Sequence, residues 1–138
     1  MTPLQASLSL AQFDDVECLT ARRIAAAERY HEGLKNIEQI GLPPLCTDGS
    51  HIYWYYPIHY SQRHELVRFA MQRGSDIAES YHRNCADLNC FREFSRDCKN
   101  AKITAESIIY LPTYPRFTDR EIDKVIATIK QYFGAIGD

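Results

Sequence analysis

Four consecutive polar side chains stand where a ligand could be recognised. They lie at the end of a segment, 77–81, whose composition predicts a short strand, and they are Tyr81, which is the last residue of that segment, and His82, Arg83 and Asn84. Polar residues at the end of a strand often line clefts. The simpler alternative is an ordinary solvated loop. We take these four residues as candidates for substrate contacts.

Four potential zinc ligands begin in the same stretch, and they are His82, Cys85, Cys90 and Cys98. Structural zinc sites usually combine two tight ligand pairs. Only the first pair here is tight, since the later spacings are wider and unequal. The favoured alternative is that the later cysteines pack as small hydrophobic residues. We therefore expect no metal site.

An aromatic run forms the centre of a predicted strand from residue 51 to residue 60. It reads Tyr53, Trp54, Tyr55 and Tyr56, and Pro57 then predicts an edge position or a bulge. Aromatic rings on a sheet could stack against a ligand ring. The sequence places no basic stripe beside them, which favours a core on one face and a partner interface on the other.

Composition limits the classes of protein to consider. The chain has 138 residues, 45% of them hydrophobic and 25% charged, with a formal charge of −2. These values are typical of a globular protein and argue against disorder, nucleic-acid binding and binding to anionic membranes. The sequence shows no apolar run long enough to span a bilayer and no secretion signal. With an odd number of cysteines, we expect a reduced, cytoplasmic protein.

Known catalytic motifs are missing from the sequence. It contains no glycine-rich phosphate loop with a Walker lysine and no dinucleotide fingerprint. It also contains neither the Gly-x-Ser-x-Gly elbow nor the His-Glu-x-x-His motif. Nucleotide-binding enzymes, serine hydrolases and zinc proteases are therefore disfavoured.

Helical periodicity dominates the first 40 residues. Apolar residues recur every three or four positions from residue 4 to residue 37. A helix of this length is long for so small a chain, so we expect it to bend near Asp14–Asp15 or to project from the body. Its first turns carry an apolar surface made of Leu4, Leu8, Leu10 and Phe13. The cover for this surface is the domain's own core, a second copy or another polypeptide.

The remaining pattern alternates helices with short strands. We expect a helix capped by Ser61 and ended by Gly74, a helix over 101–107 and a strand over 108–111. Thr118 and Glu121 form a capping box for a last helix that Gly134 would end. The prediction is one α/β or α+β domain over 1–138, with a long or bent helix in 1–40. A small α/β domain, a sheet covered by helices, then fills 51–138.

Several of these segments together resemble a known family. They are Leu4–Phe13, Leu42-Pro43-Pro44, Tyr56-Pro57-Ile58 and Leu111–Arg116, followed by the capped last helix. In order and spacing they resemble the C-terminal part of the DegT/DnrJ/StrS-type sugar aminotransferases, which are fold-type-I enzymes dependent on pyridoxal phosphate. The resemblance implies a C-terminal small domain that covers the active-site cleft and contributes to a dimer. At Tyr81–Cys85 the chain lacks the proline of the family's His-Tyr-Pro stretch.

The resemblance also implies what this chain lacks. The family's cofactor pocket and Schiff-base lysine belong to a large domain upstream of the segment that Met1 begins. The five lysines here match no catalytic position of the family, and they are Lys35, Lys99, Lys102, Lys124 and Lys130. We therefore expect no catalytic and no cofactor-binding residue in this chain, and no transamination by the chain alone. Pyridoxal phosphate would come with a large-domain partner.

Three interpretations stay open at this point. The chain is half of a split enzyme, a folded remnant that serves as an interaction or structural module, or a piece of a longer protein. The expected partner is a second copy or a large-domain chain, bound through Leu4, Leu8, Leu10 and Phe13. We expect neither nucleic acid nor a membrane as a partner.

Overall fold

The computed structural model describes residues 1–45 and 51–136, which leaves Cys46 outside the described residues. The elements follow in the order α1 (Pro3–Phe13), α2 (Val16–Leu34), β1 (Tyr56–His59), α3 (Arg63–Gln72), β2 (Ala78–Glu79), η1 (Cys85–Asp87), η2 (Asn89–Phe94), α4 (Lys99–Ser107), β3 (Ile108–Leu111) and α5 (Asp119–Ile136). The mixed fold predicted from the sequence, helices with a small sheet, is confirmed. Within the described residues, no helix has the length and apolar character that crossing a bilayer requires.

The sheet has three antiparallel strands in the order β1-β3-β2. Side chains alternate between its two faces, as the period of two in a strand requires. One face is fully buried and consists of Tyr56, Ile58, Ile109 and Leu111. The other face is only partly buried, so the core lies on one side. Pro57 belongs to β1, an edge strand, as predicted, and β1 is joined on its open side by Gly41.

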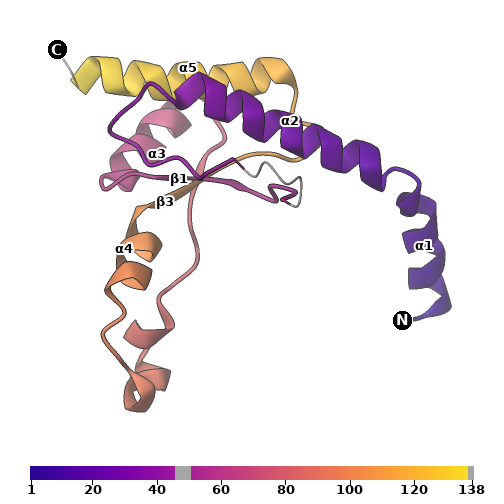
Figure 1. The fold of residues 1–138 in the computed structure, drawn as a ribbon, viewed down its shortest axis with the longest axis horizontal. Coiled ribbons are helices and arrows are strands. Elements are labelled where there is room, and N and C mark those ends of the chain that lie inside the picture. The colour runs from indigo at the N-terminus through magenta and orange to yellow at the C-terminus, as the bar shows by residue number, and fades with distance from the viewer. Residues whose placement is uncertain (46–50, 137–138) are drawn as a thin grey trace.

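Helices form a layer over the buried face of the sheet. In Figure 1, α2 and α5 lie side by side on this side of the sheet, and α3 packs against α5. The contact between α2 and α5 is close because Gly33 has no side chain. A Cβ atom added at Gly33 would lie 2.6 Å from Cδ1 of Ile126. The close approach of the two helices therefore favours glycine at position 33.

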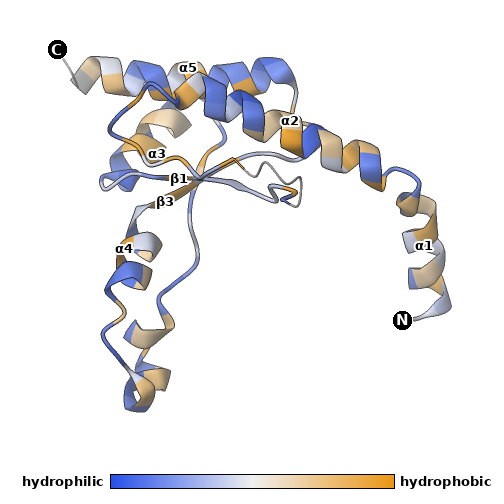
Figure 2. Ribbon diagram, viewed as in Figure 1, coloured by the Kyte–Doolittle hydropathy of each residue, from blue (hydrophilic) through white to orange (hydrophobic). Residues whose placement is uncertain are grey.

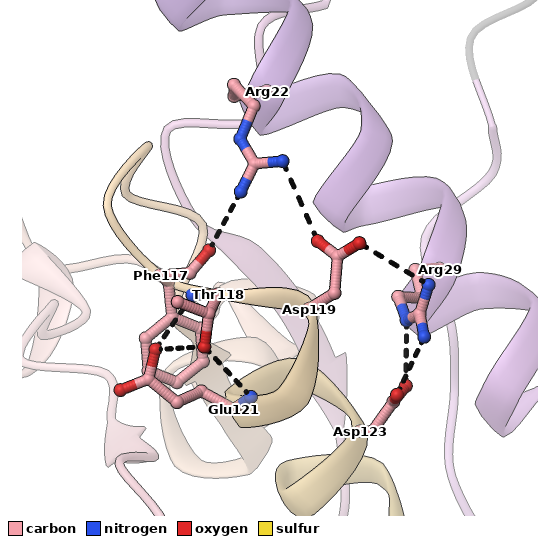
Figure 3. A network of polar contacts seen from close by, with 7 residues as sticks. All are labelled: Arg22, Arg29, Phe117, Thr118, Asp119, Glu121 and Asp123. Carbon is pink, nitrogen blue, oxygen red and sulfur yellow. Dashed lines mark hydrogen bonds and ion pairs between the residues drawn. The ribbon is translucent and has the colours of Figure 1, made fainter.

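The start of α5 confirms the predicted capping box. The backbone N–H of Glu121 donates to the hydroxyl of Thr118 at 3.3 Å, and the Thr118 N–H donates to the Glu121 carboxylate at 2.7 Å (Figure 3). Beside this cap, Arg29 of α2 holds Asp123 through two hydrogen bonds of 2.7 Å. Arg22 reaches Asp119 at 3.7 Å. These contacts join the two helices at their exposed edge.

The N-terminal helical region is divided into two helices. The expected bend occurs at Asp14–Asp15, where α1 ends and α2 begins. In Figure 1, α1 also projects away from the body, so the helix both bends and projects. The capping box of α1 joins Thr2 and Gln5. No residue of α1 is buried, and Figure 2 shows hydrophobic residues along it.

The strand predicted over 51–60 is wrong for its first half. Strand β1 begins only at Tyr56, because Tyr53 has a φ of 47° and turns the chain. The hydroxyl of Thr113 lies 2.7 Å from the Tyr53 carbonyl oxygen and 2.9 Å from that of Trp54. These hydrogen bonds hold the aromatic run in a bend, which an extended strand would not allow.

Three further boundaries differ from the sequence prediction. Gln62 rather than Ser61 occupies the N-cap position of α3. The strand expected over 77–81 is reduced to Ala78–Glu79, since only these residues pair with β3. Helix α5 continues past Gly134 to Ile136, and a Cβ atom added at Gly134 would meet nothing within 4 Å. The strand over 108–111 is confirmed.

Candidate functional site

The four candidate residues line one hollow of about 520 Å³, which we call the polar hollow. Tyr81, His82, Arg83 and Asn84 form one wall, between β2 and η1. Lys102 and Glu106 of α4 and Arg63 of α3 also line the polar hollow. Residues far apart in sequence therefore surround the predicted stretch. This placement is compatible with ligand contacts and leaves the roles of the four residues as proposals.

Each candidate side chain has a different setting. The rings of Tyr81 and His82 lie together, with centroids 4.4 Å apart, and the His82 ring meets Tyr110 edge to face at 6.2 Å. The His82 N–H donates to the Ser80 hydroxyl at 3.1 Å, which fixes the backbone at this turn. Both rings are exposed at the hollow, so they can present aromatic edges to a ligand.

Asn84 is engaged in local structure. Its side-chain oxygen accepts a hydrogen bond from the Ala86 N–H at 3.3 Å, and its amide donates to Asp87 at 3.1 Å. These contacts cap η1. Arg83 is exposed at the rim. Asn84 thus shapes the wall of the hollow, whereas Arg83 is free to reach into it.

Arg63 is a residue of the hollow that sequence reasoning did not identify. Its side chain is only 15% exposed, and its Nη1 donates to the Ala105 carbonyl oxygen. Glu79 lies 3.4 Å from its Nε and also contacts Nδ1 of His64. Arg63 is distant in sequence from residues 81–84. The pairing of β2 with β3 and the contact of α3 with β2 bring it to the polar hollow, and no local pattern in the sequence predicts these contacts.

The polar hollow contains cations that can bind an anionic ligand. Arg83 and Lys102 line it and form no ion pair among the described residues, whereas Arg63 is paired with Glu79. Guanidinium and ammonium groups bind phosphate and carboxylate oxygens through charge-assisted hydrogen bonds. The hollow is also large enough for part of a sugar or nucleotide.

A second, smaller hollow is lined in part by Tyr110, and we call it the aromatic hollow. Its volume is about 250 Å³, and its walls include Trp54, Tyr55, Tyr110 and Tyr114. Arg23 and Asp76 supply one charge of each sign at this hollow. In the aromatic run, Tyr53 and Tyr56 are buried in the core, while Trp54 and Tyr55 are exposed, and the partner interface expected on the exposed side stays a prediction.

The cysteines considered as zinc ligands are exposed on the segment between β2 and α4. They are Cys85, Cys90 and Cys98, and none of them packs in a core. Exposure corrects the expectation that Cys90 and Cys98 pack as small hydrophobic residues. Within residues 1–45 and 51–136, no three metal-binding side chains gather into one group.

The lysines do not fit a pyridoxal-phosphate site. A Schiff-base lysine needs a partly desolvated position with a phosphate cradle around it. All five lysines are exposed. Lys35 pairs with Glu32 at 2.6 Å, and Lys124 donates to the Gly74 carbonyl oxygen at 2.7 Å. Lys102 lies at the polar hollow, but its side chain is open to solvent. None of the five lysines therefore has the partly desolvated position that a Schiff base requires.

Comparison with known proteins identifies similar sequences over almost the whole chain. The family model described as "DegT/DnrJ/EryC1/StrS aminotransferase family" matches residues 1–130. An uncharacterized protein, MJ1066 of Methanocaldococcus jannaschii, is 27% identical over 95% of this chain and 36% of its own length. GDP-perosamine synthase of Caulobacter vibrioides is 24% identical over 95% of this chain and 37% of its own length. The chain thus spans about a third of the length of these relatives.

Solved structures share the fold. The aminotransferase TlmJ from Streptoalloteichus hindustanus superposes with a TM-score of 0.84 at 23% identity, over 96% of this chain and 37% of its own. DesV of S. venezuelae, solved in complex with a ketimine intermediate, gives a TM-score of 0.83 at 21% identity, over 93% of this chain and 35% of its own. At these identities the likeness supports the fold alone.

Proposed function

Because the chain belongs to the DegT/DnrJ/EryC1/StrS aminotransferase family, we propose that it supplies the C-terminal domain of a pyridoxal-phosphate-dependent nucleotide-sugar aminotransferase. The observation that carries this proposal is the match over residues 1–130, which corresponds to about a third of the relatives' length. The exposure of all five lysines supports a second part of the proposal: the chain transaminates only together with a large domain that holds the cofactor. Its proposed compartment is the cytoplasm.

In this proposal the polar hollow faces the substrate. Tyr81, His82 and Arg83 contact the sugar nucleotide, and Asn84 holds the wall in shape. The cations Arg83 and Lys102 at the hollow support contact with an anionic substrate, because arginine and lysine pair with phosphate oxygens. These residues bind and orient, while the bond-making chemistry belongs to the cofactor in the large domain.

The surface of α1 supports a protein partner. Leu4, Leu8, Leu10 and Phe13 are between 59% and 72% exposed. At 100° per residue, Leu4 and Leu8 lie on one face of the helix, and Leu10 and Phe13 lie on nearly the opposite face. A helix that is apolar on two opposite sides is typically buried on both. The partner is a large-domain chain or a second copy of this chain. In a dimer, both apolar faces of α1 could be covered.

The alternative function is a folded interaction or structural module without a catalytic role. It is favoured by the same exposed surface of α1, which binds a partner whether or not catalysis follows. The two functions differ in the identity of that partner. Only the first requires a chain that contains a lysine-bearing large domain.

Purification from the native host tests the proposal. The chain is tagged at its C-terminus, and co-purifying proteins are identified. We expect a stoichiometric partner whose sequence carries the large domain and which holds pyridoxal phosphate. Recovery of the chain alone, or only with itself, contradicts the aminotransferase proposal and supports the module.

A variant of α1 makes the same experiment sharper. Leu8→Asp places a charge on an apolar face, so we expect it to lose the partner while helical content by circular dichroism stays nearly unchanged. Gln72→Asp is the control for an added charge, since Gln72 is an exposed polar position on a different helix, α3. Equal binding by the Leu8→Asp and unaltered chains would exclude this face of α1 as the contact.

A further inference from the structure

The aromatic hollow is a separate place from the polar hollow, and the two have no lining residue in common. Its floor is formed by the end of β3 and the residues that follow, Leu111, Pro112 and Thr113, which are buried. A volume of about 250 Å³ is below the usual range for nucleotide or drug-sized ligands. It suits a single ring with a short polar chain.

Arg23 is a held cation without an acidic partner. Its Nη1 donates to the Trp54 carbonyl oxygen at 3.1 Å and lies 3.5 Å from the Thr113 hydroxyl. The guanidinium lies over the Trp54 ring, 4.8 Å from its centroid. Among the ion pairs formed by the described residues none involves Arg23, whereas neighbouring Arg22 is paired with Asp119. Arg23 is therefore pre-positioned to bind an anion.

The walls offer flat aromatic faces. Tyr55 stacks on Tyr110, with ring centroids 4.7 Å apart and an angle of 27° between the planes. The Trp54 ring stands at 86° to Tyr55. Two faces at nearly a right angle can hold one further ring by a stacked contact and an edge contact. The ligand that fits them carries an aromatic ring.

A negative charge completes the lining. Asp76 is exposed at the hollow, two residues before the strand β2. It lines the hollow together with Tyr114, and the pKa of the Tyr114 hydroxyl is raised first by burial and then by the Asp76 carboxylate. Tyr114 therefore stays protonated near neutral pH, and Asp76 is the group at this hollow that can pair with a cation.

From these groups we propose that the aromatic hollow binds a free α-amino acid with an aromatic side chain. The carboxylate pairs with Arg23, the ammonium group with Asp76, and the ring packs against Tyr55 and Trp54. Among the described residues no lysine lines this hollow, so the proposal is one of binding and includes no Schiff-base step. The proposal goes beyond the aminotransferase function and does not depend on a large domain.

Trp54 provides a direct measurement, since it is the only tryptophan of the chain. L-Phenylalanine is titrated into the purified chain while Trp54 emission is followed with excitation where tyrosine and phenylalanine do not absorb. We expect a saturable change with a Kd on the order of 1 mM, as suits so small a site. Phenylpropionate lacks the ammonium group and phenylethylamine lacks the carboxylate. Each should bind about tenfold more weakly, and L-alanine, without the ring, should cause no change.

Two variants assign the charges. Arg23→Gln should weaken L-phenylalanine and phenylpropionate about tenfold and leave phenylethylamine unchanged, which also shows that the hollow is intact. Asp76→Asn should weaken L-phenylalanine and phenylethylamine and leave phenylpropionate unchanged. Arg22→Gln is the matched control and should alter none of the affinities.

Two results would overturn the proposal. One is the absence of a saturable change in Trp54 emission up to roughly 10 mM L-phenylalanine. The other is equal affinity for all three ring compounds in the unaltered chain, which would mean that the ring alone is recognised. Neither depends on a variant that folds. Failure here leaves the proposed aminotransferase function in place, because that function is tested by the identity of the partner.

Discussion

The body of the molecule and its two projecting segments are stabilised in different ways. The body consists of α2, α3, α5 and the sheet, and it contains the fully buried side chains. The projecting segments are α1 and residues 81–107, which carry η1, η2 and α4 and include no buried residue. In Figure 1 both extend away from the layer of α2 and α5.

The two regions differ in how much of their structure rests on burial within this chain. Helix α1 is held by local contacts, such as the capping box of Thr2, and α4 is joined to the body where Arg63 donates to the Ala105 carbonyl oxygen. Helices shorter than about 12–15 residues are marginal in water when nothing packs against them. The body can fold through its own burial. In the proposed function, the projecting segments are the surfaces at which a large-domain partner would bind.

The largest expected effect separates the two regions by stability. Ile129 is fully buried in the body, so Ile129→Ala should lower the free energy of unfolding by about 2–5 kcal/mol. Leu8 is 59% exposed in α1, and Leu8→Ala should change the free energy of unfolding by less than about 0.5 kcal/mol. Urea unfolding monitored by circular dichroism measures both. Similar losses for the two variants would mean that α1 belongs to the same cooperative unit.

A second comparison concerns two glycines in helices. At Gly33, a Cβ atom would lie 2.6 and 2.9 Å from two methyl carbons of Ile126, so Gly33→Ala should cost about 1–2 kcal/mol despite the better helix propensity of alanine. At Gly134, nothing lies within 4 Å, and Gly134→Ala should stabilise by about 0.5–1 kcal/mol. Opposite signs in thermal unfolding are expected. Stabilisation by both would contradict the close contact of α2 with α5.

Two buried tyrosines provide a smaller test within the body. The hydroxyl of Tyr30 is buried and has no hydrogen-bond partner among the described residues, so Tyr30→Phe should leave stability unchanged or raise it by about 1 kcal/mol. The hydroxyl of Tyr56 lies 3.2 Å from Nδ1 of His31, and Tyr56→Phe should cost about 1 kcal/mol. A loss of stability in Tyr30→Phe rather than in Tyr56→Phe would contradict this expectation, because it would mean that the Tyr30 hydroxyl has a hydrogen-bond partner.

The smallest effect is a dependence on pH. Hydrogen bonds from Arg29 lower the pKa of Asp123 below its ordinary value near 4 (Figure 3). The stabilisation is therefore present above about pH 4 and is lost as the pH falls through the lower pKa of the folded state. The Asp123→Asn variant should be less stable than the unaltered chain above about pH 4, and this difference in the free energy of unfolding should shrink as the pH falls through that range. Added salt should also make the difference smaller. Asp97→Asn, on a projecting segment, serves as the control and should leave the stability of the body unchanged.

Local signals in the sequence predicted the elements whose determinants are local. The capping box at Thr118 and Glu121 and the strand over 108–111 are confirmed because neighbouring residues decide them. Contacts between distant residues decide the rest. Tyr53 is turned out of a strand beside Thr113, sixty positions away, and no pattern within 51–60 reports that contact.

The two hollows also combine residues that local sequence patterns predict with residues that only distant contacts bring together. Residues 81–84 were selected because they follow a strand, and the structure places them around one hollow. Arg63 completes that hollow only through the packing of α3 on the sheet, and Arg23 meets Trp54 only because α2 crosses the bend of the aromatic run. The distances involved are properties of the fold, so single-sequence reasoning could not have found either arginine.

Titration with pyridoxal phosphate tests the central proposal, that this chain transaminates only together with a large domain that holds the cofactor. The purified chain is incubated with pyridoxal phosphate, reduced with borohydride and mapped by mass spectrometry. The account predicts only partial labelling spread over the exposed lysines, Lys35, Lys99, Lys102, Lys124 and Lys130. A stoichiometric adduct at one lysine, with Lys102 at the polar hollow as the position to watch, would contradict it.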